Sequence, residues 1–224
     1  MTEITDHLAD IVERVARAAQ HAQRSATSVT IVAISKQQPS SAIVEAHRVG
    51  ITHFGESYVQ EALPKMDAVG ELAVTWHFVG KLQANKTRHV AERFAWVHTV
   101  DRLRIAERLN EQRPAHAAPL NVLIQVNQGD EAQKSGAAPA DVAELARAIV
   151  ELPRLKLRGL MTLPPQNAAA QCFAELAALR AQLVHAGIEL DTLSMGMSAD
   201  FREAIAAGAT MVRIGTAIFG RRSG

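Results

Sequence analysis

The stretch Val29-Thr30-Ile31-Val32-Ala33-Ile34, which leads directly into Ser35 and Lys36, decides the fold class of this chain. It is a continuous run of apolar and β-branched residues with no polar alternation. Such a run is typical of a strand that is buried on both faces, as the strands of a parallel sheet are. A helical pattern follows at residues 40–49 and stops at Gly50, so the run opens a strand–helix unit.

The same alternation continues along the rest of the chain, after a first helical stretch. We predict strands at residues 29–34, 52–54, 74–79, 96–100, 120–126, 155–163, 192–195 and 211–214. We predict helices at residues 6–24, 40–49, 58–69, 85–93, 101–112, 141–152, 168–186 and 199–207, with a short closing helix after Gly215. Asp6 and Asp101 are the expected N-caps of their helices, and Pro64 is expected to interrupt or bend its helix.

Strict alternation of strands and helices predicts an α/β fold with a parallel sheet. Eight such units predict a closed (β/α)8 TIM barrel, with residues 6–24 as an extra N-terminal helix. An open doubly wound sheet is disfavoured because the first turn, residues 35–39, is not rich in glycine. No linker-like stretch divides the chain, so we expect a single domain over residues 1–224.

The composition excludes several classes of protein. The 224 residues include 24 Lys and Arg against 23 Asp and Glu, a net charge of +1 that gives no basic footprint for nucleic acid. The longest apolar runs are shorter than the roughly 18–20 residues of a membrane span, and the first residues lack the layout of a signal peptide. The single cysteine, Cys172, is compatible with a reducing compartment. We expect a cytoplasmic protein without nucleic-acid or membrane partners.

In a barrel, functional groups lie at the carboxyl ends of the strands. Of the six lysines in the chain, Lys36 alone directly follows a long buried strand. An amine held over an apolar floor loses hydration, which lowers the pKa of a lysine and leaves the amine nucleophilic. Schiff-base formation with a carbonyl requires such an amine. The alternative is a lysine that extends into solvent, which is the commoner role for a lysine at the end of a strand.

The turns after the last two predicted strands are rich in small residues. They read Ser194-Met195-Gly196-Met197-Ser198 and Arg213-Ile214-Gly215-Thr216. Small residues and hydroxyls before a helix offer N–H donors to an anion, and the loops after strands seven and eight form the recurrent phosphate site of barrels. Each glycine alone is equally well explained as a plain turn. Together with Lys36, the two turns predict a site for a phosphorylated carbonyl compound.

Two further residues at strand ends are candidates for the site. Arg213, at the end of the last strand, is expected to point inward beside the ligand; the alternative is a salt bridge, for example to Glu56. His77 is either a pocket residue or a hydrogen-bonded histidine at a strand end. The nine histidines show no metal-ligand spacing, so we expect no metal.

The candidate residues belong to motifs that resemble one known family, over about residues 29–222. The motifs are Ile34-Ser35-Lys36, His53-Phe54-Gly55-Glu56, Tyr58-Val59-Gln60-Glu61, Trp76-His77-Phe78-Val79-Gly80, Leu82-Gln83-Ala84-Asn85-Lys86, Lys134-Ser135-Gly136, Leu157-Arg158-Gly159-Leu160-Met161, Leu193-Ser194-Met195-Gly196-Met197-Ser198 and Val212-Arg213-Ile214-Gly215-Thr216-Ala217-Ile218-Phe219-Gly220. The chain is similar to the YggS/PROSC family of pyridoxal phosphate homeostasis proteins. No single motif is specific, but their combination is.

This resemblance implies a fold-type III barrel, like the N-terminal domain of alanine racemase. It implies pyridoxal 5′-phosphate (PLP) held as a Schiff base on Lys36. Beside what the resemblance implies, we keep His77 as a candidate cofactor-binding residue. The implied phosphate contacts are Met197, Ser198, Gly215 and Thr216. Arg213 would lie near the pyridine nitrogen, and because arginine does not lose its proton, it would keep that nitrogen unprotonated.

The chain departs from the family pattern at two positions. Ser57 replaces the usual Asn, which puts one side-chain contact at the cofactor pocket in doubt. Lys81 replaces the usual Pro and adds a positive charge at the rim of the third strand. Neither position touches the predicted lysine or phosphate cradle.

The resemblance also implies a function: a carrier that buffers PLP and maintains vitamin B6 homeostasis without catalytic turnover. Alanine racemase needs a second acid/base from a separate domain, whereas this sequence stops just after the barrel and its only tyrosine, Tyr58, is expected on helix 58–69. We therefore expect no catalytic residue, a monomer, and PLP-dependent apo-enzymes as candidate recipients. A racemase-like fold-type III enzyme is the first alternative, and a phosphate-dependent aldolase that uses Lys36 is the second.

Overall fold

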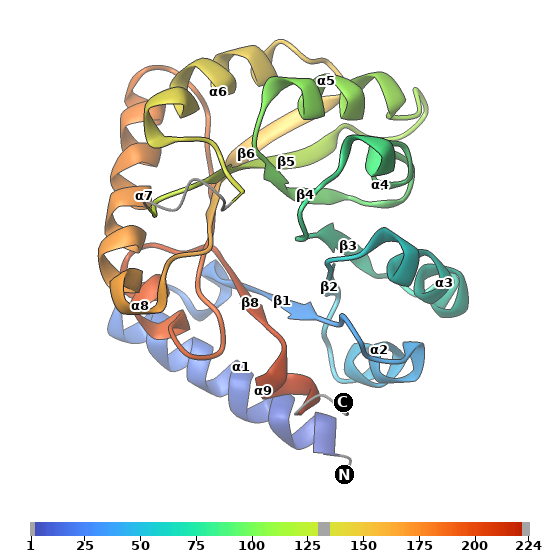
Figure 1. Ribbon diagram of the computed structural model, residues 1–224. Coiled ribbons are helices and arrows are strands. Elements are labelled where there is room, and N and C mark those ends of the chain that lie inside the picture. Colours follow the sequence, from blue (N-terminus) through green and yellow to red (C-terminus); the bar gives the residue numbers. More distant parts are fainter. Residues whose placement is uncertain (1–2, 130–134, 221–224) are drawn as a thin grey trace.

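The strands of this protein close into one parallel barrel in sequence order, in which β1 pairs with both β2 and β8 (Figure 1). The computed structural model describes residues 3–129 and 135–220. The strands are β1 (Thr30–Ile34), β2 (His53–Glu56), β3 (Thr75–Phe78), β4 (Trp96–Val100), β5 (Leu120–Val126), β6 (Leu155–Thr162), β7 (Thr192–Ser194) and β8 (Met211–Ile214). The predicted (β/α)8 fold class is confirmed.

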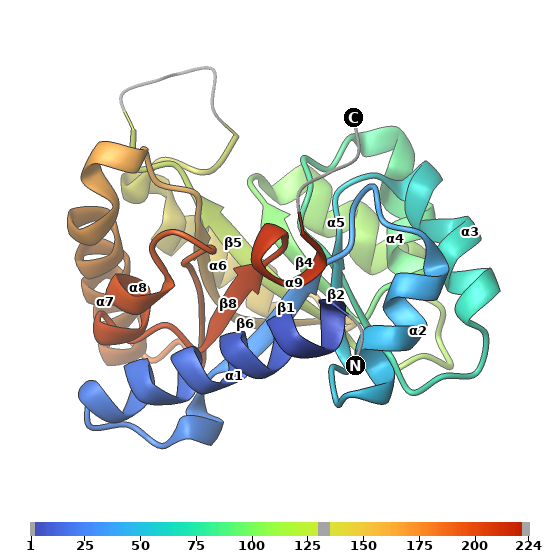
Figure 2. The same ribbon diagram turned by 90° about the horizontal axis from the view of Figure 1, so that it is seen from below.

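Helices surround the barrel and cover the outer face of the sheet (Figure 1). They are α1 (Glu3–His21), α2 (Ser40–Arg48), α3 (Val59–Val69), α4 (Thr87–Arg93), α5 (Leu103–Gln112), α6 (Val142–Val150), α7 (Ala169–His185), α8 (Phe201–Ala206) and α9 (Thr216–Phe219). The predicted extra helix is α1, which packs across α8, α9 and α2 (Figure 2). Within the described ranges, no helix has the length and apolar character that crossing a membrane requires.

Two local predictions were wrong, and a third was wrong in part. Asp6 is not an N-cap, because α1 already contains it in its first turn. Asp101 is not the cap of α5, because the cap is Arg102, whose guanidinium donates instead to the Asp101 carboxylate at 2.7 Å. Pro64 does not interrupt α3, which continues through it as one helix, and the alternative, a bend at Pro64, stays a prediction. The elements are therefore predicted better than their ends, because a capping side chain competes with other local partners.

The pleat of the strands decides which side chains enter the barrel. Along β1, Val32 packs inside the barrel, Ala33 packs outward against the helices, and Ile34 again packs inside. The small interior cluster is made of Val32, Trp96, Leu123, Met161 and Met211. Because side chains alternate with a period of two, the next inward position after Ile34 is Lys36, just beyond the end of the strand.

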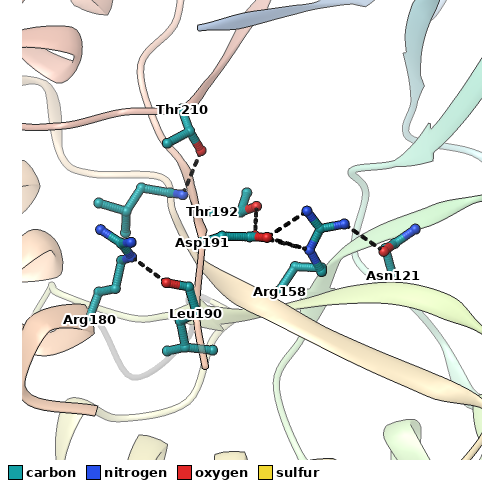
Figure 3. Close-up of polar contacts among 8 residues, drawn as sticks. Asn121, Arg158, Arg180, Leu190, Asp191, Thr192 and Thr210 are labelled. Carbon is teal, nitrogen blue, oxygen red and sulfur yellow. Dashed lines mark hydrogen bonds and ion pairs between the residues drawn. The ribbon is translucent and has the colours of Figure 1, made fainter. Parts of the chain in front are cut away.

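The amino end of the barrel, where the strands begin, holds a compact polar cluster around Arg158 (Figure 3). Its guanidinium donates to both carboxylate oxygens of Asp191, at 2.7–3.0 Å, and to Oδ1 of Asn121 at 3.0 Å. The same guanidinium lies 4.9 Å from the centre of the Trp96 ring. The Arg158 guanidinium at the amino end of the barrel is thus paired with a carboxylate, hydrogen-bonded to an amide oxygen and in contact with an aromatic ring.

Candidate ligand site at the carboxyl ends of the strands

Several hollows open at the carboxyl end of the barrel, and Lys36 lines two of them. The first has a volume of about 260 Å³ and is bordered by the turns that follow β7 and β8. It is lined by Lys36, Met197, Ser198, Arg213, Gly215 and Thr216, among others. The second, of about 440 Å³, lies over β2 and β3 and includes Ser57, Tyr58 and Lys81.

Lys36 is carried on a turn whose backbone is held by its neighbours. The N–H of Ser35 donates to the carbonyl of Gly55 at 3.0 Å, so pairing with β2 extends to the residue before Lys36. The following residue, Gln37, has a left-handed backbone with φ of 62°, which is uncommon for a residue with a side chain. Its N–H donates to the carboxylate of Glu61 on α3. These contacts fix the direction in which Lys36 leaves the strand.

A second lysine, Lys65, lies beneath this turn and is fully engaged. Its amine donates to the Ser35 carbonyl at 2.7 Å, to Glu56 Oε1 at 2.8 Å and to Glu61 Oε1 at 2.6 Å. The Ser35 hydroxyl also donates to Glu56 Oε1, at 2.7 Å. Burial raises the pKa of Glu56, and the hydrogen bonds from Lys65 and Ser35 oppose that shift. The acids near the end of β1 are therefore taken by Lys65, and the half-buried amine of Lys36 has no hydrogen bond or ion pair within the described residues.

The turn after β7 is shaped by a glycine. Gly196 has φ of 90°, and a Cβ built on it would lie 2.5 Å from Cβ of Ala204, so only glycine fits there. The N–H of Met197 donates to Oδ1 of Asp200 at 2.6 Å, so this amide is already used within the loop. Ser198 lies between these two residues on the lining of the first hollow.

The turn after β8 brings Gly215 and Thr216 to the same hollow. Gly215 lies against β1, because a Cβ built on it would be 3.4 Å from Cβ of Ile34. α9 begins at Thr216, and the first turn of a helix leaves backbone N–H groups without a partner inside the helix. Such groups, together with the hydroxyls of Thr216 and Ser198, are donors suited to an anion.

Arg213 lies on the inner side of β8 and is almost completely buried. Its guanidinium donates to the Ser194 hydroxyl at 2.7 Å and to the Thr162 carbonyl at 2.8 Å. It makes no salt bridge to Glu56, which is paired with Lys65. Burial lowers the pKa of Arg213 to about 10, against the attraction of Asp200, so the guanidinium keeps its charge at neutral pH.

His77 lies in the barrel interior and does not line either hollow. Its Nε2 is 2.9 Å from Nδ1 of His53, and its Nδ1 is 2.9 Å from Nε2 of His98. Nδ1 of His98 is in turn 2.9 Å from the Ser194 hydroxyl, the same oxygen that accepts from Arg213. His77 therefore reaches the site only through other side chains.

The structure brings together seven of the eight predicted site residues, all except His77. Their roles as ligand contacts stay predictions, and Lys134 lies outside the described residues. Lys65, His98 and Ser194 support the site and were not predicted from the sequence. The signal for Lys65 was present, because it falls on the buried face of α3 between Ala62 and Val69.

A wider hollow, of about 900 Å³, lies at the other end of the barrel beside Arg158 and Asp191. It runs past the ends of α6 and α7, where Val150 and Val184 are exposed. This hollow contains the paired Arg158 and Asp191 and none of the predicted site residues. A large volume therefore does not by itself identify the candidate site.

Both the sequence and the structure of this chain are similar to those of known proteins. The family described as "Alanine racemase, N-terminal domain" matches residues 7–223. A pyridoxal phosphate homeostasis protein of Pseudomonas aeruginosa is 52% identical over 224 residues, covering 99% of this chain and 97% of that protein. The protein of the same name in Escherichia coli is 51% identical, covering 99% and 98%. A structure of PipY from Synechococcus elongatus with PLP bound superimposes with a TM-score of 0.86 at 35% identity, covering 97% of this chain and 100% of that chain.

Proposed function

We propose a function from the premise that this chain belongs to the pyridoxal phosphate homeostasis proteins of the alanine racemase N-terminal domain family. It binds PLP in the first hollow at the carboxyl end of the barrel, and it carries and buffers this reactive aldehyde. By doing so it maintains the intracellular supply of vitamin B6.

The observation that carries this proposal is the contrast between the two lysines at the end of β1. Lys65 has three acceptors, whereas the amine of Lys36 faces the hollow without a partner among the described residues. When bound, PLP supplies an aldehyde that forms a Schiff base with an amine. Lys36 is the amine that we propose for this bond.

The other lining residues fit the remaining parts of such a molecule. Ser198, Gly215 and Thr216 supply hydroxyl and backbone donors at helix starts, which suit a phosphate group. Arg213 has donors but no acceptor, so it can face a ring nitrogen only if that nitrogen is unprotonated. An unprotonated ring withdraws electrons more weakly than a protonated one.

We propose that the protein has no catalytic turnover. The names of the relatives support this, because they describe homeostasis and not a reaction.

A racemase-like activity is the second candidate, and one observation favours it. Tyr58, expected on the helix, lies just before α3, is 60% exposed and borders the second hollow together with Lys36. A phenol and an amine on one hollow are the two groups that a two-base racemase uses.

An absorbance spectrum before and after borohydride, followed by peptide mapping, tests the proposal. We expect a yellow protein whose cofactor becomes fixed on the peptide that contains Lys36. Lys36→Ala should abolish the adduct, whereas Lys81→Ala, which removes another amine of the second hollow, should retain it. Label that is found solely on another lysine would contradict the assignment.

Incubation with L-alanine in heavy water separates the two candidates. The carrier exchanges no α-hydrogen, so deuterium incorporation at a rate of enzymatic turnover would favour the racemase. Loss of that incorporation in Tyr58→Phe would confirm the phenol as its second base. A colourless protein that condenses sugar phosphates would instead favour the aldolase.

We also propose that the protein is a cytoplasmic monomer, that residues 1–224 act as one PLP-binding domain, and that PLP-dependent apo-enzymes receive the cofactor. Light scattering after size-exclusion chromatography measures the mass in solution. Mixing the loaded protein with an apo-enzyme, and following the recovery of that enzyme's activity, measures transfer.

A further inference from the structure

The barrel interior contains a line of side chains that the proposed function does not use. His53, His77, His98 and Ser194, here called the histidine row, come from β2, β3, β4 and β7, and consecutive members are 2.9 Å apart at their nearest polar atoms. The stagger of the strands produces the row. His77 is level with Gly55, two residues beyond His53, and Trp96 is level with His77, two residues before His98. The row therefore climbs from the amino end of the barrel towards Arg213.

The row ends at a group that can only donate. A guanidinium has five N–H donors and no acceptor, so the Ser194 hydroxyl oxygen must accept the 2.7 Å bond from Arg213. The hydroxyl keeps one hydrogen of its own, and the atom next to it is Nδ1 of His98. Within the described part of the chain, the Ser194 hydroxyl has no other partner.

This arrangement selects one direction for the hydrogen bonds. If the hydroxyl donates to Nδ1 of His98, each neutral imidazole accepts at Nδ1 and donates from Nε2 to the next histidine. If the bonds ran the other way, the Ser194 hydrogen would be buried without an acceptor, which is unfavourable. The bonds therefore run from Arg213 towards His53, whose half-buried ring lies at the other end of the row.

The surroundings keep the imidazoles neutral. Arg213 lies beyond Ser194 at one end, and Arg158 lies over Trp96, whose ring is stacked on His77 with the two centres 5.5 Å apart. Burial, with repulsion from Arg213, holds the pKa of His98 well below its ordinary value. Burial, with the neighbouring His98 and His53, does the same for the pKa of His77. A neutral imidazole has one donor and one acceptor, as the row requires.

We propose that His98, supported by His77 and His53, is a positioning residue for Arg213. By accepting the Ser194 hydrogen, it presents the Ser194 oxygen to the guanidinium and fixes the orientation of Arg213 in the ligand site. All three histidines then carry their hydrogen on Nε2. This proposal depends on the proposed function in one respect only, namely that the molecule that Arg213 faces is PLP.

The tautomers are measured on the protein without cofactor. Long-range nitrogen–hydrogen correlation spectra of isotope-labelled histidine distinguish Nδ1–H, Nε2–H and the charged imidazolium. We expect His53, His77 and His98 to be neutral with hydrogen on Nε2, and Arg213→Met to produce a mixture of tautomers. A hydrogen on Nδ1 of any of the three in the wild type, or an unchanged pattern in Arg213→Met, would overturn the proposal.

Cofactor binding tests the positioning role. His98→Phe leaves the Ser194 hydroxyl without an acceptor and should weaken the Kd for PLP about tenfold, with a shifted absorption band of the bound cofactor. His98→Asn places Oδ1 near the position of Nδ1 and should restore the Kd to within about threefold of the wild type. His89→Gln, on an exposed histidine, is the control.

These outcomes are distinguishable from failure of the proposed function. Equal weakening in His98→Asn and His98→Phe would show that only packing matters, and wild-type affinity in His98→Phe would show that the row has no role. If the wild type binds no PLP, the proposed function fails, while the tautomers of the unloaded protein still decide whether the row fixes Arg213.

Discussion

The two ends of the barrel carry similar residues in opposite states. At the amino end, Arg158 is joined to Asp191, Asn121 and the Trp96 ring, so its charge is satisfied (Figure 3). At the carboxyl end, Lys36 lines two hollows and its amine has no partner within the described residues. The hollow beside Arg158 has the greater volume, but none of the predicted site residues lines it. The proposed choice of site therefore rests on a lysine at the carboxyl ends of the strands, where barrels place functional groups, and not on the volume of a hollow.

The largest effect that we expect comes from the buried lysine beneath the site. Lys65→Met removes the cation from Glu56, whose side chain is fully buried, and should lower the free energy of unfolding by about 3–5 kcal/mol. Lys36→Met removes an amine without partners and should change it by less than about 0.5 kcal/mol while abolishing bound PLP. Urea unfolding followed by circular dichroism measures both variants. Similar losses in the two would break the distinction between a structural and a functional lysine.

The histidines between the two ends should make stability sensitive to acid. The pKa of His77 lies well below the ordinary value of 6.5, mainly because of burial, so the folded protein stays neutral there while the unfolded chain takes up a proton. The contribution of neutral His77 to the free energy of unfolding is fully present above about pH 6.5, and it is lost progressively as the pH falls below that value. At pH 5 the loss is at most about 2 kcal/mol for one such histidine, a limit set by the ordinary pKa of the unfolded chain.

His77→Phe keeps a ring against Trp96, and its free energy of unfolding should therefore fall by up to about 2 kcal/mol less than that of the wild type between pH 7.5 and pH 5. Chemical unfolding at the two pH values measures the difference. The raised pKa of Glu56 acts in the opposite direction but is common to both proteins, so it cancels. Identical losses would show that His77 is already charged in the folded state.

A smaller effect is expected at the amino end. Arg158→Met should lower the free energy of unfolding by about 1 kcal/mol, because the Asp191 side chain is 60% exposed and water screens the pair. The variant should bind PLP with unchanged affinity, since Arg158 lies at the opposite end from Lys36. Titration followed by absorbance measures that affinity. Weaker binding would show that the two ends are coupled through Trp96 and His77.

The smallest effect is expected at the rim of the second hollow. Ser57→Asn introduces the residue that is usual in the family at this position. Ser57 is half-buried and lies away from the turns after β7 and β8. We expect the Kd for PLP to change by no more than about twofold, because one half-exposed polar contact contributes little. A change of an order of magnitude would move part of the binding site from the first hollow to the second.

The sequence predicts the barrel because strands that are buried on both faces appear as continuous apolar runs, as in residues 29–34 and 120–126. It predicts the lining residues because barrels place functional groups at the carboxyl ends of strands, which fixes Lys36 and Thr216 without any knowledge of contacts. The predicted strands at β4, β5 and β8 match the observed bounds.

These rules do not predict the side chains that hydrogen-bond to the site residues from within the barrel. His53, His77 and His98 are separated by more than twenty residues each, and only the register of neighbouring strands brings their rings to hydrogen-bond distance. The partner of Glu56 was also not predicted, because Lys65 and Arg213 both follow ordinary patterns and packing alone decides between them. Pairwise contacts between distant elements are not contained in the periodicity of either element.

The stacking of Trp96 on His77 has a practical consequence. The chain contains two tryptophans, and Trp76 packs outside the sheet whereas Trp96 lies inside the barrel, between Arg158 and the imidazole. A Trp76→Phe protein would therefore retain a single intrinsic fluorophore in the interior. Its emission would report the ionisation of the adjacent ring as a quenching signal, so the core of the barrel can be observed optically without an attached dye.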